Sequence, residues 1–351
     1  MGYGCFPGCC CFKKSEVSNA IITLPSTQID MAAPASSSPV KNENPTFQSV
    51  TAADESNKFE DISDSHLNDL QRLQKYCPDA TKEECTRFLE AKKLNYDLAL
   101  EQLTSYLQWR KELLLDQEFV STISQSKSDE FDFESCATSE QTVDELDWHH
   151  ATDKAVQYLM SVGKDATRNN EPLELPQLAR IVTYPGSDEH LRCSNGDRIL
   201  HLLMAQMDPN IASDMAFALT VAFYLDRKLS RNSMEKMTIV LDVRAGHGWA
   251  NPRPNQLIPF IRKINHIMER NFPERLSKLI LFPLPSIATA IWKIIRAFLD
   301  PNTAGKIAVI SGSSSEKSPP PYKVLEKHLD RKAIDRMEEL RLNSFIFSSS
   351  N

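Results

Sequence analysis

Met237-Thr-Ile-Val-Leu-Asp-Val243 begins the part of the chain that decides the fold. An unbroken apolar run that ends in a carboxylate is typical of a buried strand in a parallel sheet. After a loop rich in Gly, Asn and Pro, residues 256–270 place apolar side chains at three- and four-residue spacings. This spacing predicts a helix with one apolar side, formed by Leu257, Phe260, Ile261, Ile264, Ile267 and Met268.

The alternation of strand and helix continues toward the C-terminus. Lys278–Phe282 is a second apolar run, and we expect Pro283 and Pro285 to end it because proline cannot donate to a sheet ladder. Residues 286–299 predict another helix, and a turn then leads to a third strand at residues 307–310. Strands and helices at this short spacing predict a right-handed parallel α/β unit.

Four blocks in this stretch agree in order and spacing with one known family: Thr238-Ile-Val-Leu-Asp242 followed by Ala245-Gly246, Asn271-Phe-Pro-Glu-Arg-Leu276, Ala290-Ile-Trp-Lys293, and Phe298-Leu-Asp-Pro-Asn-Thr-Ala-Gly-Lys-Ile307. They resemble the CRAL-TRIO lipid-transfer domain of the fungal phosphatidylinositol transfer proteins. The resemblance implies an α/β fold in which a mixed or parallel sheet with covering helices encloses an apolar lipid pocket.

A separate helical pattern occupies residues 61–115. Apolar residues recur at helical spacing from Leu67 to Tyr76, and Thr81 and Glu84 then have the spacing of a capping box. The run Arg87-Phe-Leu-Glu-Ala-Lys-Lys-Leu-Asn-Tyr-Asp97 is similar to the small helical lobe that precedes CRAL-TRIO domains. Taken alone, this block also fits a three-helix ubiquitin-binding module.

Composition narrows the class of protein. The chain has 351 residues, of which 41% are apolar and 25% charged, so it can bury a substantial core. Its formal net charge of −7 argues against a nucleic-acid partner. No apolar run is long enough to cross a bilayer, and the first residues lack the apolar core of a secretory signal. We therefore expect a cytoplasmic protein that associates with membranes peripherally.

Four of the eight cysteines cluster near the N-terminus, at Cys5, Cys9, Cys10 and Cys11. Thioacylation of these thiols beside Phe12 and two lysines would anchor the chain to an anionic membrane surface. An unmodified tail is the alternative, whereas zinc binding is disfavoured because three adjacent cysteines cannot easily converge on one ion. Adjacent His149 and His150 likewise point apart on a helix, so we expect no metal site.

These patterns divide the chain into five parts. We expect a disordered tail with the cysteine cluster at residues 1–60 and the helical lobe at 61–115. An acidic linker is expected at 116–145 and the lipid-binding domain at 146–312. Residues 313–351 combine a Ser/Pro-rich linker with a charged amphipathic helix over 324–342.

The resemblance also implies a headgroup site. In the transfer proteins, phosphoinositide binding falls on a Glu, a Thr and a Lys whose motif positions here are Glu274, Thr303 and Lys306. A lysine suits phosphate, a hydroxyl can donate or accept, and a carboxylate accepts from inositol hydroxyls. The alternative is that Glu274 and Lys306 form an ordinary ion pair. Phosphatidylcholine recognition uses polar residues in the strand at 237–241, which is apolar here apart from Thr238.

Residues 286–299 match the gate helix of the resembled proteins. Its apolar side chains cover more than one face: Ile287, Ile291, Trp292, Ile295 and Phe298. Such a helix can close over lipid and, when open, press its apolar side into a membrane. The alternative is a fully buried core helix.

No motif indicates an enzyme. The run Val243-Arg-Ala-Gly-His-Gly248 starts like a dinucleotide loop, but the third glycine is absent, and no nucleophile elbow or phosphate-cradling loop occurs. We therefore expect non-enzymatic binding and intermembrane transfer of a phospholipid, with phosphatidylinositol as the ligand and no cofactor. The alternatives are a carrier of a sterol or terpenoid and a signalling scaffold with protein partners that the sequence does not identify.

Overall fold

The computed structural model describes residues 68–113, 115, 143–164, 175–285, 292, 296–297 and 301–345. Several predictions therefore lie outside the described residues: the tail with Cys5, Cys9, Cys10 and Cys11, most of the acidic linker, and Ile287, Ile291, Ile295 and Phe298 of the expected gate helix. The last three residues of the predicted linker, 143–145, belong to a helix.

The N-terminal lobe consists of three helical segments around one apolar cluster. A helix that is described from residue 68 runs to Tyr76, and α2 (Lys82–Ala91) and α3 (Tyr96–Glu112) follow it. Leu73, Cys85, Phe88, Leu89 and Leu103 are buried between them. Burial of these apolar side chains is what holds the three short helices together, because isolated helices of this length are marginal in water.

The predicted capping box at the start of α2 is confirmed. Thr81 Oγ1 accepts a hydrogen bond from the Glu84 backbone N–H, and the Glu84 carboxylate accepts one from Thr81 N–H. Thr81 Oγ1 also donates to the carbonyl of Arg231, which lies far along the chain. Thr81 therefore both begins a helix and joins the lobe to the α/β part.

Replacing Thr81 with alanine is expected to lower the free energy of unfolding by about 1 kcal/mol, because a lost N-cap leaves backbone donors without an acceptor. Thr81→Ser is the matched control, since it keeps the hydroxyl. Urea unfolding of both variants checks this, and equal losses for alanine and serine would contradict a capping role.

One five-stranded sheet forms the centre of the α/β part, with strand order β1-β2-β3-β4-β5. The strands are β1 (Ala179–Ile181), β2 (Arg198–Leu203), β3 (Met237–Asp242), β4 (Leu276–Leu284) and β5 (Ile307–Ser311). β1 is antiparallel to β2, and all other neighbours are parallel. The predicted α/β class with a mixed, mainly parallel sheet is confirmed.

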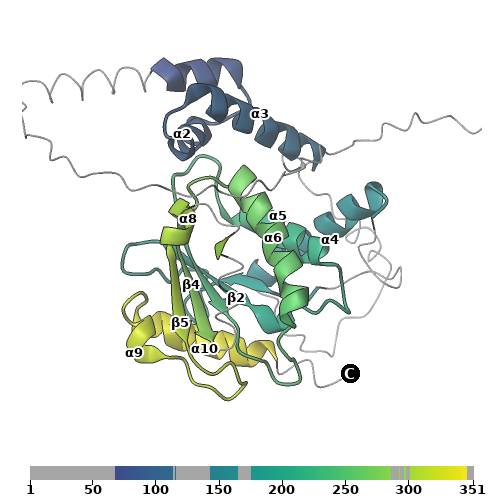
Figure 1. The fold of residues 1–351 in the computed structure, drawn as a ribbon, viewed down its shortest axis with the longest axis vertical. Coiled ribbons are helices and arrows are strands. Elements are labelled where there is room, and N and C mark those ends of the chain that lie inside the picture. The colour runs from purple at the N-terminus through teal and green to yellow at the C-terminus, as the bar shows by residue number, and fades with distance from the viewer. Residues whose placement is uncertain are drawn as a thin grey trace, which may run out of the picture. The chain divides into compact units, whose positions relative to one another are not determined.

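Helices cover both faces of this sheet (Figure 1). One face packs against α4 (Val143–Ser161), α5 (Asp214–Lys228) and α6 (Pro254–Asn271). A short 3-10 turn, η2 (Met204–Gln206), leads from β2 toward α5. Side chains alternate along each strand, so Leu200 and Leu202 face this layer while Ile199 faces the other.

The opposite face of the sheet is covered by the C-terminal part of the chain. The predicted single helix over 324–342 is wrong: α9 (Tyr322–Leu325) and α10 (Arg331–Ser344) are separate helices. Residues 326–330 turn between them, and Asp330, in an extended conformation, is the N-cap of α10. Three apolar side chains of α10 are buried against the sheet and attach this otherwise charged helix to it: Ala333, Ile334 and Met337.

The prediction that Pro283 ends the second strand is also wrong. β4 continues to Leu284, and its pairing with β5 shifts between Leu281 and Leu284 before Leu284 pairs with Ser311. A proline is tolerated where the ladder is irregular, because its missing N–H is not needed there. β4 therefore ends at Leu284, two residues later than the predicted end at Phe282.

Buried ionic contacts join the lobe to the α/β part. Glu84 is fully buried, and its carboxylate accepts from Arg231 Nε at 2.8 Å and Nη2 at 2.9 Å, and from the Tyr106 hydroxyl at 2.6 Å. Gln102 on α3 donates to two carbonyls at the end of α6. Within the described residues, no helix is both long and apolar enough to cross a membrane.

Candidate functional site

A cavity of about 400 Å³ lies between α6 and the sheet. Its interior is lined by aliphatic and aromatic side chains, among them Leu202, Val221, Ile239, Leu241, Phe260 and Ile264. The size falls in the ~300–1,000 Å³ range of small-molecule sites. Four residues of the predicted apolar side of residues 256–270 form one wall: Phe260, Ile261, Ile264 and Met268.

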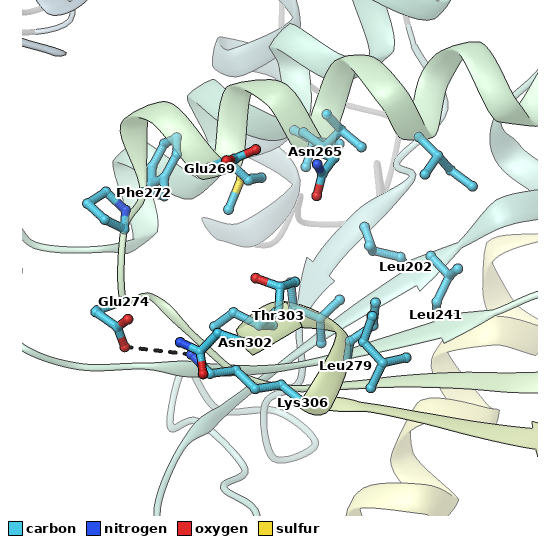
Figure 2. A pocket seen from close by; sticks show the side chains of 18 of the residues that line it. Leu202, Leu241, Asn265, Glu269, Phe272, Glu274, Leu279, Asn302, Thr303 and Lys306 are labelled. Carbon is cyan, nitrogen blue, oxygen red and sulfur yellow. Dashed lines mark ion pairs between the residues drawn. The ribbon is translucent and has the colours of Figure 1, made fainter. Parts of the chain in front are cut away.

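The three predicted headgroup residues lie together at one end of the cavity. Glu274, Thr303 and Lys306 all line it, and Figure 2 places them with Asn302 opposite the end that holds Leu202 and Leu241. Lys306 Nζ is 3.6 Å from Glu274 Oε2, with side chains 25% and 17% exposed. The ion pair expected as the alternative is therefore present, and it stands at the cavity wall.

Lys236, which does not itself line the cavity, also contacts Glu274, and the sequence analysis did not single it out. Its Nζ donates to Glu274 Oε2 at 3.2 Å, closer than Lys306. One carboxylate thus faces two ammonium groups. A signal was present in the sequence: Lys236 and Lys306 each directly precede a predicted parallel strand, and such strands begin at the same edge of a sheet.

Local backbone conformation presents the Glu274 side chain. Glu274 has φ of 56°, in the left-handed region that glycine favours. Holding a non-glycine residue there costs of order 1 kcal/mol, and such strain clusters at ligand sites. Thr303 and Lys306 are placed by the short helix α8 (Pro301–Gly305) and the turn after it, where Lys306 N–H donates to the Thr303 carbonyl.

Further polar groups along the cavity come from α6 and from the lobe. Asn265 and Glu269 lie on α6 one turn apart, and Figure 2 shows Asn265 pointing into the cavity. Lys92 and Gln102 of the lobe line it as well. The four-residue spacing Ile261, Asn265, Glu269 could have placed both polar residues on the apolar side of the predicted helix.

Other predicted positions have mixed outcomes. Trp292, from the expected gate helix, lines the cavity and is half-buried. Thr238 is buried on the other face of the sheet, where its Oγ1 lies 3.3 Å from Cys193 Sγ, so it does not line the cavity.

Cys77, Cys85 and Cys193 are free thiols. No group of three metal-ligating side chains occurs in the part of the chain that the structure describes.

Residues 182–336 match the family model described as the CRAL/TRIO domain. Over these residues the chain is similar to that domain. This match covers all strands but β1 and includes the cavity end formed by Glu274, Thr303 and Lys306. The CRAL/TRIO domain is a lipid-binding family, which agrees with the apolar interior of the cavity.

Two curated relatives are similar to this chain over about two thirds of its length. The phosphatidylinositol/phosphatidylcholine transfer protein SFH12 of Arabidopsis thaliana is 22% identical over 237 residues, covering 66% of this chain and 35% of the relative. The SEC14 cytosolic factor of Yarrowia lipolytica is 24% identical over 233 residues, covering 66% and 39%. The chain thus spans well under half the length of these relatives. The crystal structure of Sfh5 superposes with a TM-score of 0.46 at 13% identity, over 76% of this chain and 84% of that one.

Proposed function

We propose that this chain binds phosphatidylinositol and exchanges it between membranes without covalent chemistry. The observation that carries the proposal is the division of the cavity into an apolar interior and an end that holds Glu274, Thr303 and Lys306. A molecule with two acyl chains and a charged headgroup matches both parts. The name of the Arabidopsis relative, a phosphatidylinositol/phosphatidylcholine transfer protein, supports this ligand class.

Each polar group suits one part of the headgroup. Lys306 offers a point charge to the phosphate, and the Thr303 hydroxyl adds a hydrogen bond. The Glu274 carboxylate accepts from inositol hydroxyls. At 3.6 Å the Lys306–Glu274 contact is longer than a hydrogen bond, so both groups retain capacity for a ligand. The Lys306 ammonium group carries the charge opposite to that of a phosphodiester.

Membrane exchange requires the cavity to open at a lipid surface. We infer that the segment containing Trp292 acts as the gate, with peripheral association strengthened by acylation of the N-terminal cysteines. Trp292 supports this role because it is a large aromatic side chain at the cavity wall. Opening would be a two-state change driven by the higher affinity of the open form for the membrane.

The test is mass spectrometry of the lipid extracted from the purified full chain. We expect phosphatidylinositol at close to one molecule per chain, and at least a ~10-fold loss in Lys306→Ala and Thr303→Asp, since a charge-assisted hydrogen bond is worth ~1.5–3 kcal/mol. Lys263→Ala is the matched control, because Lys263 on α6 pairs with Asp214 and does not line the cavity.

Two other results would overturn the proposal. A different hydrophobic ligand that is unaffected by Lys306→Ala would identify a carrier of a sterol or terpenoid. A chain that purifies without lipid and takes none from vesicles would identify an interaction scaffold.

A further inference from the structure

Two buried arginines at the junction of the lobe and the α/β part have no carboxylate partner among the described residues. Arg87 on α2 and Arg275 before β4 are each 4% exposed. Arg87 Nη1 donates to the carbonyls of Ser233 at 2.5 Å and Arg231 at 3.4 Å. Arg275 donates to the carbonyls of Glu235 at 2.8 Å and Ser230 at 2.6 Å. Carbonyl groups thus accept some of their hydrogen bonds, but neither guanidinium group forms an ion pair with a carboxylate of the described residues.

The acidic groups nearby are engaged by other arginines. Glu84 accepts two hydrogen bonds from Arg231, and Asp226 accepts two from Arg110. A third carboxylate near Arg275, that of Glu235, pairs with Arg192 and Arg198. Taking an unpaired charge out of water costs several kcal/mol even after relaxation, so an excess of positive charge at a buried junction calls for a counter-ion.

A small cavity lies beside these groups. Its volume is about 10 Å³, and its polar lining consists of Arg87, Tyr106, Asp226, Arg231, Asn271 and Arg275. Arg87 Nε is buried and has no hydrogen-bond partner. This volume is about that of one water-sized sphere. A monatomic anion needs less space than phosphate or sulfate and is therefore the counter-ion that best suits so small a cavity.

We propose that this cavity binds a chloride ion, held by Arg87 and Arg275. The donors are guanidinium N–H groups, whose charge suits a halide. Burial and, after it, the charge of Arg87 lower the pKa of Arg275 to about 10, while Tyr106, Glu235 and Glu84 act in the opposite direction. A bound anion would relieve this repulsion.

The ion would tie the lobe to the headgroup end of the large cavity. Arg87 belongs to α2, and Arg275 directly follows Glu274, whose left-handed backbone presents its carboxylate to the cavity. Phe272 lines both cavities. A chloride bound between Arg87 and Arg275 would thus hold the turn that contains Glu274 in place, from the side away from the large cavity.

Chloride NMR and crystallography test the site on the full chain. We expect the ³⁵Cl line of sodium chloride to broaden saturably with the protein, with at least a ~10-fold weaker affinity in Arg87→Met and Arg275→Met, because each removes one of two charged partners. Arg72→Met is the control, since Arg72 lies on the same lobe and is half exposed. In crystals soaked with sodium bromide, an anomalous peak should lie within about 3.5 Å of Arg87 Nε.

The bromide experiment needs no variant, so it decides the matter even if Arg87→Met or Arg275→Met fails to fold. A scatterer without anomalous signal at that position would identify a water molecule and overturn the proposal. Broadening that is equal in Arg87→Met, Arg72→Met and the unaltered chain would do the same. Lipid content plays no part in either measurement, so a failure here is distinct from a failure of the proposed lipid function.

Discussion

Leu241→Trp is expected to reduce the bound lipid from close to one molecule per chain to less than a tenth. Leu241 lies on β3 in the apolar part of the cavity, away from the headgroup end (Figure 2). An indole at this position would occupy space that an acyl chain needs inside about 400 Å³. Because Leu241 is only half-buried and faces an open cavity, the added volume should cost the fold little compared with the ~1–3 kcal/mol of overpacking a closed core.

The measurement is the lipid-to-protein ratio by mass spectrometry, with the melting temperature recorded beside it. Val324→Trp adds the same group at a 39% exposed position on α9, outside the cavity, and should leave the ratio unchanged. If Leu241→Trp melts like the unaltered chain and still carries a full complement of lipid, the cavity is not where lipid binds.

Asp242→Asn is expected to lower the free energy of unfolding by roughly 3 kcal/mol at pH 7, because removing one partner of a buried ion pair leaves the other charge uncompensated. Asp242 ends β3 and is fully buried. Its carboxylate accepts from Arg244 Nη2 at 2.6 Å and from Arg244 Nε at 3.0 Å. Arg244 in turn pairs with Glu338 on α10 at 2.6 Å, so the loss should also loosen the C-terminal helix.

The effect should depend on pH in a defined direction. Burial opposes ionisation of Asp242, but the neighbouring His201 and Arg244 outweigh it and hold its pKa at about 2, below the usual 3.8. His201 Nε2 is 3.7 Å from the Asp242 carboxylate, and burial lowers the pKa of the His201 ring, which disfavours its charged form. We therefore assign the lowered pKa of Asp242 chiefly to Arg244. A depressed carboxyl pKa stabilises the fold above pH ~4, and this stabilisation is lost as the pH falls toward ~2.

Urea unfolding from pH 6 to pH 3 checks this prediction. The gap between the unaltered chain and Asp242→Asn should be constant above pH ~5 and should narrow below pH ~4, where the unfolded carboxyl takes up a proton. Asp69→Asn is the control, because Asp69 pairs with a half-exposed arginine and such surface pairs contribute ~0–1 kcal/mol. A gap that stays constant down to pH 3 would contradict the assignment.

Local patterns in the sequence were enough to predict many elements. The apolar run at 237–243 predicted β3, the three- and four-residue spacings at 256–270 predicted α6, and Thr81 with Glu84 predicted the cap of α2. Each of these depends on residues close together in the chain, where period and capping chemistry act directly. The division into five parts and the acylation of the cysteines stay predictions.

Contacts between distant residues were beyond such patterns. Lys236 contacts Glu274, 38 positions along the chain, and Arg244 contacts Glu338 on the C-terminal helix α10. The break between α9 and α10 was missed because 324–342 keeps a helical period, while the turn at 326–330 lets the apolar side of α10 reach the sheet. Periodicity says which side of a helix is apolar but not which surface covers it.

The sequence by itself determined the parallel α/β unit, the helical lobe and, through its motifs, the three side chains at the cavity end. Only the tertiary structure decided that Lys236 and Lys306 both contact Glu274 and that α10 covers the second face of the sheet. It also decided that Arg87 and Arg275 are buried without an ion pair to a carboxylate of the described residues. The reason is physical: propensity and period act over one or two turns of chain, whereas burial and the pairing of charges depend on which distant segments meet.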